Sequence, residues 1–216
     1  WIELGPASSN PDAGIVPSAE QIRRLAPVVD ALAAGPLPLS VDATQPEVLG
    51  WALDAGIGMV NDVRGFPDAA TRERLADGEA EVVVVHSLVA EERATRDTAT
   101  PEEVLASIDS FFDRRLEELV RAGVDETRLI VDPGMGFFLG SDPRSSIAVL
   151  QSIPRLRARF GRPVFISVSR KSFLRAITGQ SIETIAGATL AAELHAAREG
   201  ADYLRSHEIA ALRTGL

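Results

Sequence analysis

Polar and ionisable side chains follow the apolar runs of this 216-residue sequence, at the points where buried strands would end. Asp, Asn and Ser also form turns and cap helices, so any one of them could have only a local structural role. Their recurrence after every run instead predicts a shared rim of polar groups, because parallel strands bring their carboxyl ends to one edge. The candidates are Ser8, Ser9, Asp42, Asn61, Asp62, His86, Asp132, Ser169, Lys171, Arg205 and His207.

Lys171 is the only lysine among the 22 basic residues of the sequence. The other basic residues are arginines, so surface charge does not require lysine here. An ammonium group is a compact charge with three rotatable donors, which suits a specific polar contact better than general solubility. The alternative is an ordinary surface lysine retained by chance.

Arg205 and His207 alternate at the end of the last predicted strand, so both side chains point to the same side. With Arg170 and Lys171 they could form a positive pocket in a protein whose formal net charge is −9. Two linked phosphates would suit such a pocket, because phosphate oxygens accept charge-assisted hydrogen bonds. The alternative for Arg205 is an ion pair with one of the strand-end aspartates.

The glycine-rich segment of residues 132–140 follows a predicted strand. It lacks the Gly-Lys-Ser/Thr of a phosphate loop and the glycine spacing of a dinucleotide site. Phe137 and Phe138 could form walls for a flat ligand or an apolar plug. A lone histidine after a buried strand is more often a satisfied core residue than a catalyst, which is the favoured interpretation of His86. His195 lies among Ala and Leu residues and is interpreted as structural.

Short apolar runs predict strands, and segments of helical periodicity lie between them. A helix is predicted from Ser18 to Ala34, with Ser18 and Gln21 as a capping box and Gly35 as its stop. Two others span residues 100–123 and 182–200. The predicted strands are Trp1–Leu4, Leu37–Val41, Gly58–Val63, Glu81–Val85, Leu129–Val131, Val164–Val168 and Tyr203–Leu204.

Alternating strands and helices indicate an α/β fold with parallel βαβ units. The sequence contains seven strand–helix pairs. One more pair before Trp1 would give the eight that close a (β/α)8 TIM barrel, and Trp1 reads as the middle of a strand. We therefore expect the first βα unit to be missing from this chain. An open doubly wound sheet is the alternative, and residues 1–216 are interpreted as a single domain.

The composition excludes several classes of protein. Hydrophobic residues make up 45% and charged residues 25%, as in globular domains, and there is no cysteine for a disulfide, a thiolate zinc site or a cysteine nucleophile. The acidic net charge argues against nucleic acid and anionic membranes as partners. No apolar run approaches the roughly 18 residues of a membrane span.

Five strand-end motifs resemble, in order, those of the dihydropteroate synthase family. The Asp-Pro-Gly-x-Gly-Phe and Ser-Arg-Lys-Ser-Phe motifs form the most specific pair, and the resemblance covers essentially the whole chain. Residues 5–13, 132–139 and 190–196 are most similar to the sulfonamide-insensitive branch. The resemblance implies a pterin-binding, eight-stranded barrel. The five motifs are Ser40-Val41-Asp42, Val60-Asn61-Asp62-Val63, Val131-Asp132-Pro133-Gly134-Met135-Gly136-Phe137, Ser169-Arg170-Lys171-Ser172-Phe173 and Arg205-Ser206-His207.

This resemblance implies a transferase of folate biosynthesis that joins 4-aminobenzoate to a dihydropterin methyl diphosphate and releases diphosphate. It implies that Asp42 stabilises the cationic pterin-methyl species, and that Arg205 and His207 hold the diphosphate. The implied pterin-binding residues are Asp42, Asn61, Asp132 and Lys171, and the implied aminobenzoate-binding residues are Ser9, Pro11, Phe137, Phe138 and Ser172. The implied catalytic residues are Asp42, Lys171, Arg205 and His207.

The resemblance also implies a Mg²⁺ cofactor, a homodimer and a cytoplasmic location. A family asparagine that helps bind magnesium lies in the opening strand, which this chain lacks, so no metal ligand is assigned within these residues. The partners implied are the two small-molecule substrates.

Two departures from the family pattern affect particular contacts. Asn10 replaces an arginine that would contact diphosphate, and residues 136–140 replace Gly-Phe-Gly-Lys-Thr with a loop about two residues longer, by spacing to the next helix. An extra ring from Phe138 predicts a clash with the bulkier sulfonamides but not with 4-aminobenzoate. Two other functions stay open: methyl transfer from a reduced folate to a corrinoid partner, and pterin binding without synthase activity.

Overall fold

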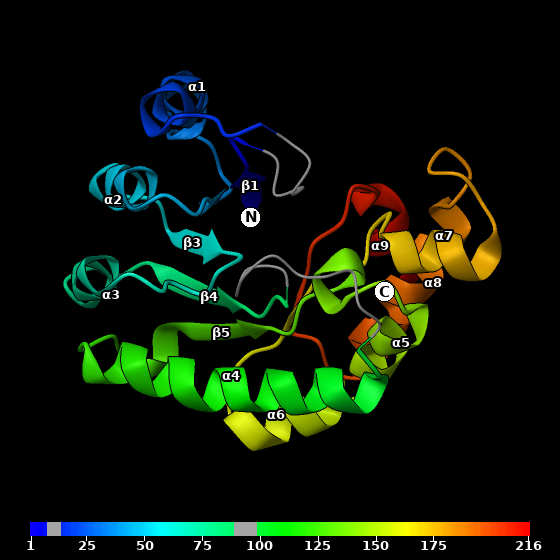
Figure 1. The fold of residues 1–216 in the computed structure, drawn as a ribbon. Helices are drawn as coiled ribbons and strands as arrows, with labels where there is room; N and C mark the ends of the chain where they lie inside the picture. Colours follow the sequence, from blue (N-terminus) through cyan, green and yellow to red (C-terminus); the bar gives the residue numbers. More distant parts are fainter. Residues whose placement is uncertain (8–13, 89–98) are drawn as a thin grey trace. The chain divides into compact units, whose positions relative to one another are not determined.

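The computed structural model describes residues 1–7, 14–88 and 99–216, and these fall into two compact units (Figure 1). The first unit contains Trp1–Val85 and Arg115–Leu129, and the second contains His86–Arg114 and Ile130–Leu216. Each unit is described by itself. The interpretation of residues 1–216 as a single domain stays a prediction.

The first unit is built on four parallel strands that neighbour one another in chain order. They are β1 (Ile2–Leu4), β2 (Leu39–Asp42), β3 (Met59–Asp62) and β4 (Glu81–Val85). Three helices connect them and stack in the same order, as Figure 1 shows for α1, α2 and α3. These helices are α1 (Ser18–Leu32), α2 (Pro46–Asp54) and α3 (Ala69–Ala76), and the unit also holds the 3-10 turn η1 (Glu126–Arg128).

Strands β2, β3 and β4 of the first unit are buried along nearly their whole length, and β1 is half-buried. Val82 to Val85 in β4 expose at most 2% of their surface, and Val41 and Val60 expose none. Strands that are covered on both faces read as continuous apolar runs rather than as alternating ones. The valine-rich runs of the sequence therefore indicate strands that are covered on both faces. The predicted parallel α/β architecture is confirmed for this unit.

The second unit contains three further strands and most of the helices. Val131 in β5 (Leu129–Asp132) forms a parallel bridge with Val164, and β6 (Phe165–Ile166) pairs in parallel with β7 (Tyr203–Leu204). The remaining elements are α4 (Pro101–Arg121, which continues into the first unit), η2 (Gly136–Leu139), α5 (Pro143–Gln151), α6 (Ile153–Phe160), α7 (Ser172–Thr178), α8 (Ala186–Arg198) and α9 (Ile209–Gly215).

The predicted capping box at the start of α1 is wrong. Pro17 is the N-cap, and no side chain caps this end, because Ser18 is already helical. Gln21 instead donates from Nε2 to the carbonyl oxygen of Val16 at 2.8 Å. A reciprocal capping box occurs at the start of α4, where Thr100 N donates to Glu103 Oε2 at 2.8 Å and Glu103 N donates to Thr100 Oγ1 at 3.3 Å.

Several element boundaries also differ from the sequence-based prediction. The strand predicted over residues 164–168 is reduced to Phe165–Ile166, and the helix predicted from residue 182 begins at Ala186. Ser167 and Ser169 follow β6 and are buried, and their hydroxyl oxygens accept from the Arg205 side chain and the His207 backbone N–H, which follow β7. The apolar run of residues 164–168 therefore predicts burial correctly but predicts a strand longer than Phe165–Ile166.

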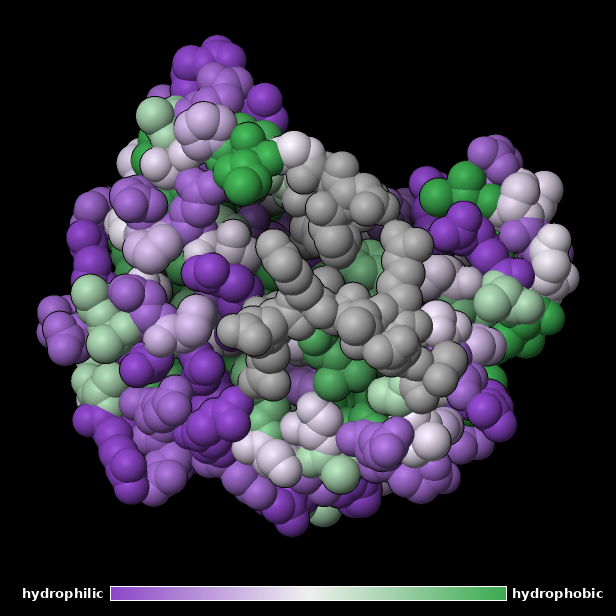
Figure 2. All heavy atoms as spheres, in the orientation of Figure 1, coloured by the Kyte–Doolittle hydropathy of each residue, from purple (hydrophilic) through white to green (hydrophobic). Residues whose placement is uncertain are grey.

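The exposed surface of the second unit carries apolar side chains on its C-terminal elements. Ile177 on α7, Ile182 in the following segment and Ile209 on α9 each expose about half of their surface, between 48% and 52%. Figure 2 shows green patches among purple ones over α7 and the segment after it. No helix in the described part of the chain combines the length and hydrophobicity that a membrane span requires.

Candidate active site

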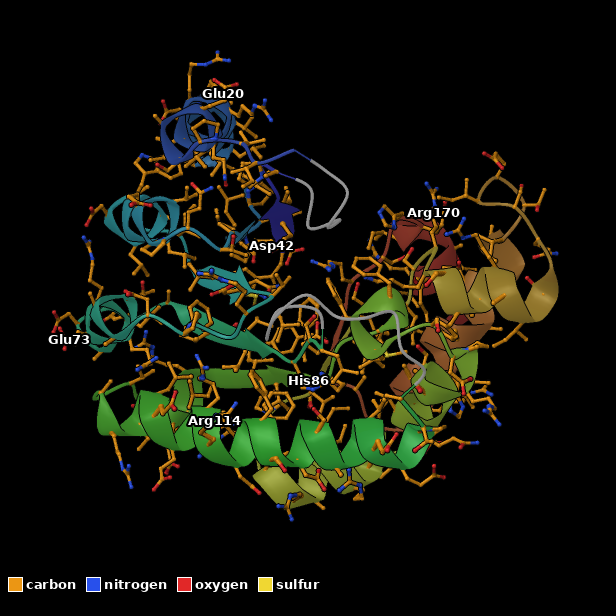
Figure 3. All side chains as sticks on the ribbon, in the orientation of Figure 1. Glu20, Asp42, Glu73, His86, Arg114 and Arg170 are labelled. Carbon is orange, nitrogen blue, oxygen red and sulfur yellow. The ribbon has the colours of Figure 1, made fainter. Side chains whose placement is uncertain are left out.

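The carboxyl ends of β2 and β3 bring two predicted site residues next to each other in the first unit. Asp42 and Asn61 are register partners on these parallel strands, and Figure 3 shows Asp42 at the end of β2. Asn61 is 1% exposed and donates from Nδ2 to Oε2 of Glu3 at 3.3 Å, whereas its Oδ1 is buried without a hydrogen-bond partner among the described residues. An unsatisfied amide oxygen is costly, so it marks a place where a ligand could donate a hydrogen.

Asp62 has a structural role instead. Its Oδ1 accepts from the backbone N–H of Arg64 at 2.9 Å, and its Oδ2 accepts from that of Phe66 at 3.0 Å. These bonds hold a turn in which Phe66 adopts a left-handed conformation with φ of 61°. Burial raises the pKa of Asp62 to about 6 and outweighs the hydrogen bonds from Arg64 and Phe66, which act in the opposite direction.

Two arginines of the first unit hold the carbonyl groups of the same turn. Arg115, which is 8% exposed, donates from Nη1 to the carbonyl oxygen of Gly65 at 2.8 Å. Arg72 donates to the carbonyl oxygens of Phe66 and Pro67 at 3.0 and 2.6 Å. Residues 62–67 are therefore fixed at both their N–H and their C=O groups.

In the second unit, the turn after β5 positions Asp132. The Oδ1 atom of Asp132 accepts from the N–H of Gly134 at 2.8 Å, and the side chain is 3% exposed. Gly134 has a φ of 76°, and a Cβ atom there would lie 2.4 Å from the carbonyl oxygen of His86. Only glycine fits such a position without displacing backbone, so the glycine of this motif is required by geometry.

His86 is a satisfied core residue, as the sequence favoured. It is 1% exposed, its Nδ1 lies 3.2 Å from the carbonyl oxygen of Pro133, and its Nε2 lies 3.0 Å from Oγ of Ser107. A neutral ring satisfies both contacts by donating to the carbonyl from Nδ1 and accepting from the serine hydroxyl. Burial lowers the pKa of His86 to about 4, which keeps the ring neutral.

Lys171 is half-buried over two aromatic rings. Its Nζ lies 4.9 Å from the ring centroid of Phe138 and 5.9 Å from that of Phe137, within the range of cation–π attraction. Phe138 is only 5% exposed, so it forms a floor below the ammonium group, and Phe137 is the more exposed of the two.

The segment that carries Lys171 also packs closely against Gly136. A Cβ atom at Gly136, where φ is 68°, would lie 3.1 Å from Oγ of Ser172 and 3.3 Å from Cβ of Lys171. Gly136 N also donates to the buried Oγ of Ser146 at 3.0 Å. The structure therefore brings Phe137, Lys171 and Ser172 together around one glycine.

Arg205 and His207 both rest on serines that follow β6. Arg205 Nε donates to Oγ of Ser167 at 3.0 Å, and Nδ1 of His207 lies 2.8 Å from Oγ of Ser169. The backbone N–H of His207 also donates to this Ser169 oxygen at 3.1 Å. The predicted alternation is confirmed, because both side chains reach the same neighbouring segment.

Arg170, which the sequence predicted to share a positive pocket with Arg205 and His207, is paired with an acid. It forms an ion pair with Glu208, the N-cap residue of α9. Burial lowers the pKa of His207, and the positive charges of Arg170 and Arg205 lower it further. A bound anion would have the opposite effect, because it favours the charged imidazolium.

Four residues singled out in the sequence lie outside the described residues: Ser8, Ser9, Asn10 and Pro11. Two residues that contact site residues were not predicted, namely Ser167 and Glu3. The Ser-Val-Ser alternation after β6 could have indicated Ser167. Asp42 and Asn61 belong to the first unit, and Asp132, Phe137, Phe138, Lys171, Ser172, Arg205 and His207 to the second.

Among the described residues, no three His, Asp or Glu side chains lie close enough together to hold a metal ion.

Comparison with known proteins identifies the family. The family model for pterin binding enzymes matches residues 1–207. Dihydropteroate synthase type-2 of Escherichia coli is 51% identical over 100% of this chain and 79% of its own length. Types 3 and 1 of the same organism are each 44% identical over 100% of this chain, covering 82% and 77% of their own lengths, which agrees with the predicted branch.

Solved structures support the same assignment. The dihydropteroate synthase of Xanthomonas albilineans, determined with 4-aminobenzoic acid, matches 98% of this chain and 75% of its own with a TM-score of 0.88 at 35% identity. A complex of the enzyme from the same organism with 7,8-dihydropteroate matches 99% of this chain and 77% of its own with a TM-score of 0.84 at 33% identity. These enzymes have the TIM-barrel fold, which confirms the predicted fold class. The chain belongs to the dihydropteroate synthase family of pterin-binding enzymes.

Proposed function

We propose that this chain condenses 6-hydroxymethyl-7,8-dihydropterin diphosphate with 4-aminobenzoate to give 7,8-dihydropteroate and diphosphate. Family membership supports the reaction, and one observation carries its assignment to particular residues. Arg205 and His207 are held by Ser167 and Ser169, respectively. A guanidinium group and an imidazole that can become protonated therefore lie beside the end of β7. A reaction that releases diphosphate requires such groups for the departing anion.

The amine of 4-aminobenzoate attacks the methylene carbon of the pterin, and the bond from that carbon to the diphosphate oxygen breaks. The leaving diphosphate takes the bonding electrons, and the amine loses a proton to solvent. Arg205 and His207 bind the anion as its charge develops. The carboxylate of Asp42 stabilises the positive charge that builds up on the pterin-methyl group, which is an electrostatic contribution fixed before the reaction begins.

Asn61, Asp132 and Lys171 bind the pterin ring in this proposal. A pterin presents adjacent N–H donors like those of guanine, and a carboxylate such as Asp132 accepts them. The buried Oδ1 of Asn61, which has no partner among the described residues, is a further acceptor. Lys171 donates to the ring carbonyl and the neighbouring nitrogen, and the Phe138 ring supports its ammonium group.

Ser172 and Phe137 shape the place for 4-aminobenzoate. The hydroxyl of Ser172 donates to the substrate carboxylate, and the half-buried ring of Phe137 forms one wall. Phe138, Ser9 and Pro11 are assigned to this place from the sequence, and the last two lie outside the described residues. The buried position of Phe138 gives it an indirect role here, through Lys171 and through the position of Phe137.

We further propose that the enzyme is insensitive to sulfonamides because of the aromatic segment that contains Phe137 and Phe138. Their ring centroids are 4.5 Å apart, so the two rings form one bulky unit beside the substrate. Deletion of Phe138 with one neighbour is expected to restore sulfonamide inhibition with little change in turnover. Measured inhibition constants for a sulfonamide, before and after deletion, test this, and an unchanged constant would contradict it.

Mg²⁺, the oligomeric state and the location complete the proposal. We propose that Mg²⁺ enters with the diphosphate substrate, that the enzyme is a cytoplasmic homodimer, and that residues 1–216 act as one pterin-binding domain. Activity titrated with MgCl₂ after treatment with a chelator tests the first, and sedimentation velocity tests the second. Fractionation of cells that produce the protein tests its location.

One assay tests the reaction itself. The protein is supplied with pterin diphosphate and MgCl₂, and diphosphate release is followed with and without 4-aminobenzoate. Release that depends on 4-aminobenzoate supports the synthase. Pterin binding without release would indicate a pterin-binding relative without this activity, and methyl transfer from a reduced folate to a corrinoid would indicate the methyltransferase alternative.

A further inference from the structure

Glu3 is an acid in the first strand of the first unit that the proposed reaction does not use. It lies in β1 and is half-buried. Its Oε2 accepts a hydrogen bond from Nδ2 of Asn61 at 3.3 Å, although the two residues are 58 positions apart in the sequence. Glu3 is therefore in direct contact with a residue to which we assign pterin binding.

The register of the strands places Glu3 and Asn61 on one face of the sheet. Glu3 is the register partner of Ser40 on β2, and Asn61 is the register partner of Asp42 on the same strand. Ser40 and Asp42 are two residues apart, so their side chains point to the same side. Strands two positions apart in a sheet are separated by roughly 10 Å. All four side chains therefore share one face, and the Glu3 side chain reaches Asn61 across β2.

Two buried polar atoms on this face have no hydrogen-bond partner among the described residues. They are Oδ1 of Asn61 and Oγ of Ser40, and both residues are 1% exposed. A buried polar atom without a partner costs free energy, so native proteins rarely keep one unless a ligand or a water molecule completes it. This pattern is the one expected of a face that binds a ligand.

The chemistry of Glu3 decides which end of the Asn61 amide meets that ligand. A carboxamide carries an acceptor and a donor at two positions of nearly equal size, so it can turn by half a rotation with little change in shape. A carboxylate only accepts hydrogen bonds. The NH2 group of Asn61 must therefore face Glu3, and its Oδ1 atom is left to face the ligand.

We propose that Glu3 is a positioning residue that fixes the Asn61 amide with its acceptor toward the pterin ring. The N–H donors of the ring then meet an oxygen at this position rather than a competing NH2 group. The role rests on the proposed function, because the ligand of Asn61 is the pterin. Glu3 acts through Asn61 and sets a preference for a ring edge that donates hydrogen bonds.

The first test replaces Glu3 by two side chains of similar size. Glu3→Gln can either accept from the Asn61 amide or donate to it, so about half of the molecules should present the acceptor, and the KM for the pterin diphosphate should rise about two- to threefold. Glu3→Met offers no acceptor, so the NH2 group of Asn61 loses its partner and the same KM should rise about tenfold. The KM for 4-aminobenzoate, which is not a ligand of Asn61, should change less than about twofold in both variants.

The second test reverses the donor and the acceptor of the pair. Asn61→Asp places a second carboxylate beside Glu3, and repulsion should raise the KM for the pterin diphosphate about thirtyfold. In the double variant, Glu3→Gln with Asn61→Asp, the new NH2 group donates to one oxygen of the new carboxylate, and the other oxygen again faces the pterin. This variant should return to within about threefold of the unaltered protein, a recovery that a merely structural role would not produce.

Glu73→Gln is the matched control for the loss of one carboxylate from the first unit. Glu73 is exposed on α3, and Figure 3 shows it pointing away from the strands. Neither KM should change by more than about twofold in this variant. Thermal unfolding verifies that each variant is folded. Should Asn61→Asp fail to fold, Glu3→Gln and Glu3→Met still test whether the KM follows the acceptor at this position.

An unchanged KM for the pterin diphosphate in Glu3→Met would overturn the proposal, and so would a double variant no better than Asn61→Asp alone. Calorimetric binding of 6-hydroxymethylpterin, which carries no diphosphate and cannot react, separates these outcomes from failure of the proposed reaction. A protein that releases no diphosphate, yet loses affinity for this pterin in Glu3→Met, would contradict the reaction and support the positioning role. An unaltered protein that does not bind the pterin would overturn both.

Discussion

The strand ends of the two units hold their functional side chains in different ways. At the end of β3 in the first unit, Asn61 and Asp62 are buried, and the Asp62 carboxylate accepts from two backbone N–H groups. At the ends of β6 and β7 in the second unit, Arg205 is half-buried and His207 exposed, and serine hydroxyls hold both. Hydroxyl groups rotate and backbone groups do not, so the cationic cluster can adjust to its ligand more easily.

This difference predicts a separation of effects. Changes in the second unit's cationic cluster should reduce activity with little change in stability, because its side chains are partly solvated. Changes to the buried acid of the first unit should alter stability and its dependence on pH. Four variants test or refine this separation, from the largest expected effect to the smallest.

Lys171→Gln should give the largest loss of activity. It removes the charged donor that we propose for the pterin ring, and kcat/KM should fall by about 10²- to 10³-fold, since a hydrogen bond to a charged group in a desolvated site is strong. Steady-state kinetics measure this, and thermal unfolding should show little change. Arg175→Gln on the exposed face of α7 is the matched control and should stay within about twofold. Equal losses in both variants would mean that overall charge matters rather than Lys171.

Gly134→Ala should give the largest loss of stability and so refine the comparison, since it affects a rigid part of the second unit. A Cβ atom would lie 2.4 Å from the carbonyl oxygen of His86, and φ is 76°. The left-handed conformation costs about 1–2 kcal/mol, and backbone displacement should bring the total to about 3 kcal/mol.

Gly56→Ala is the matched control for this variant. Gly56 has a φ of 73° but no atom within 4 Å of its Cβ position, so it should show only the conformational part. Urea unfolding of both variants measures the difference. Equal destabilisation would mean that the close approach to His86 relaxes without cost.

Asp62→Asn should change the pH dependence of stability. Burial raises the pKa of Asp62 from 3.8 to about 6 in the folded protein, so between these pH values the folded state holds a proton that the unfolded state has lost. Stability from this group is therefore fully present below about pH 4 and is lost as pH rises to about 6, by about 2–3 kcal/mol. The variant should lack this loss in urea unfolding at pH 4, 5, 6 and 7.

Asp68→Asn provides a control with the opposite sign. Hydrogen bonds from Thr71 lower the pKa of Asp68, the N-cap of α3, so its contribution is present at neutral pH and declines as the pH falls. Replacement of Asp68 should therefore reduce the gain of stability with rising pH. If both variants change the slope in the same direction, the assigned cause for Asp62 is wrong.

Phe138→Met should give the smallest effect. It keeps a large apolar side chain and removes the ring below Lys171, whose cation–π attraction contributes about 0.5–1 kcal/mol. The KM for pterin diphosphate should rise about two- to fivefold with kcat nearly unchanged. A KM identical to that of the unaltered protein would show that Lys171 needs no aromatic support.

The sequence predicts the order of the strands and helices and places candidate site residues at the strand ends, because strand ends in a parallel fold are local features of the chain. Asp132 and Gly134 could be identified from the sequence because they belong to one short motif, Asp-Pro-Gly-x-Gly-Phe. The role of Asp62 could not, since a capping side chain and a binding side chain have the same residue type, and only its two backbone partners distinguish them. Arg170 has the same difficulty: its partner Glu208 lies 38 residues further along the chain.

Burial of a charged residue is a further feature that sequence patterning does not reveal, and Glu193 has no exposed surface. Glu193 is charged in type and lies in a helix with exposed neighbours, so sequence patterning would place it in solvent. The helix at Ser18 offers a similar lesson, because Pro17 occupies the N-cap and Ser18 is already helical. A Ser or Thr caps a helix only when it occupies the N-cap position, and the motif Ser-x-x-Gln does not determine which residue is the N-cap.

The solitary ε-amine among these 216 residues gives the protein an unusual chemical property. An acylating or reductively alkylating reagent finds a single lysine target, and that target is half enclosed above an aromatic ring. The extent of labelling at Lys171 would therefore report on occupancy of the pterin site that we propose, without mutation or an attached fluorophore. In a protein rich in lysine the same reagent would average over many sites.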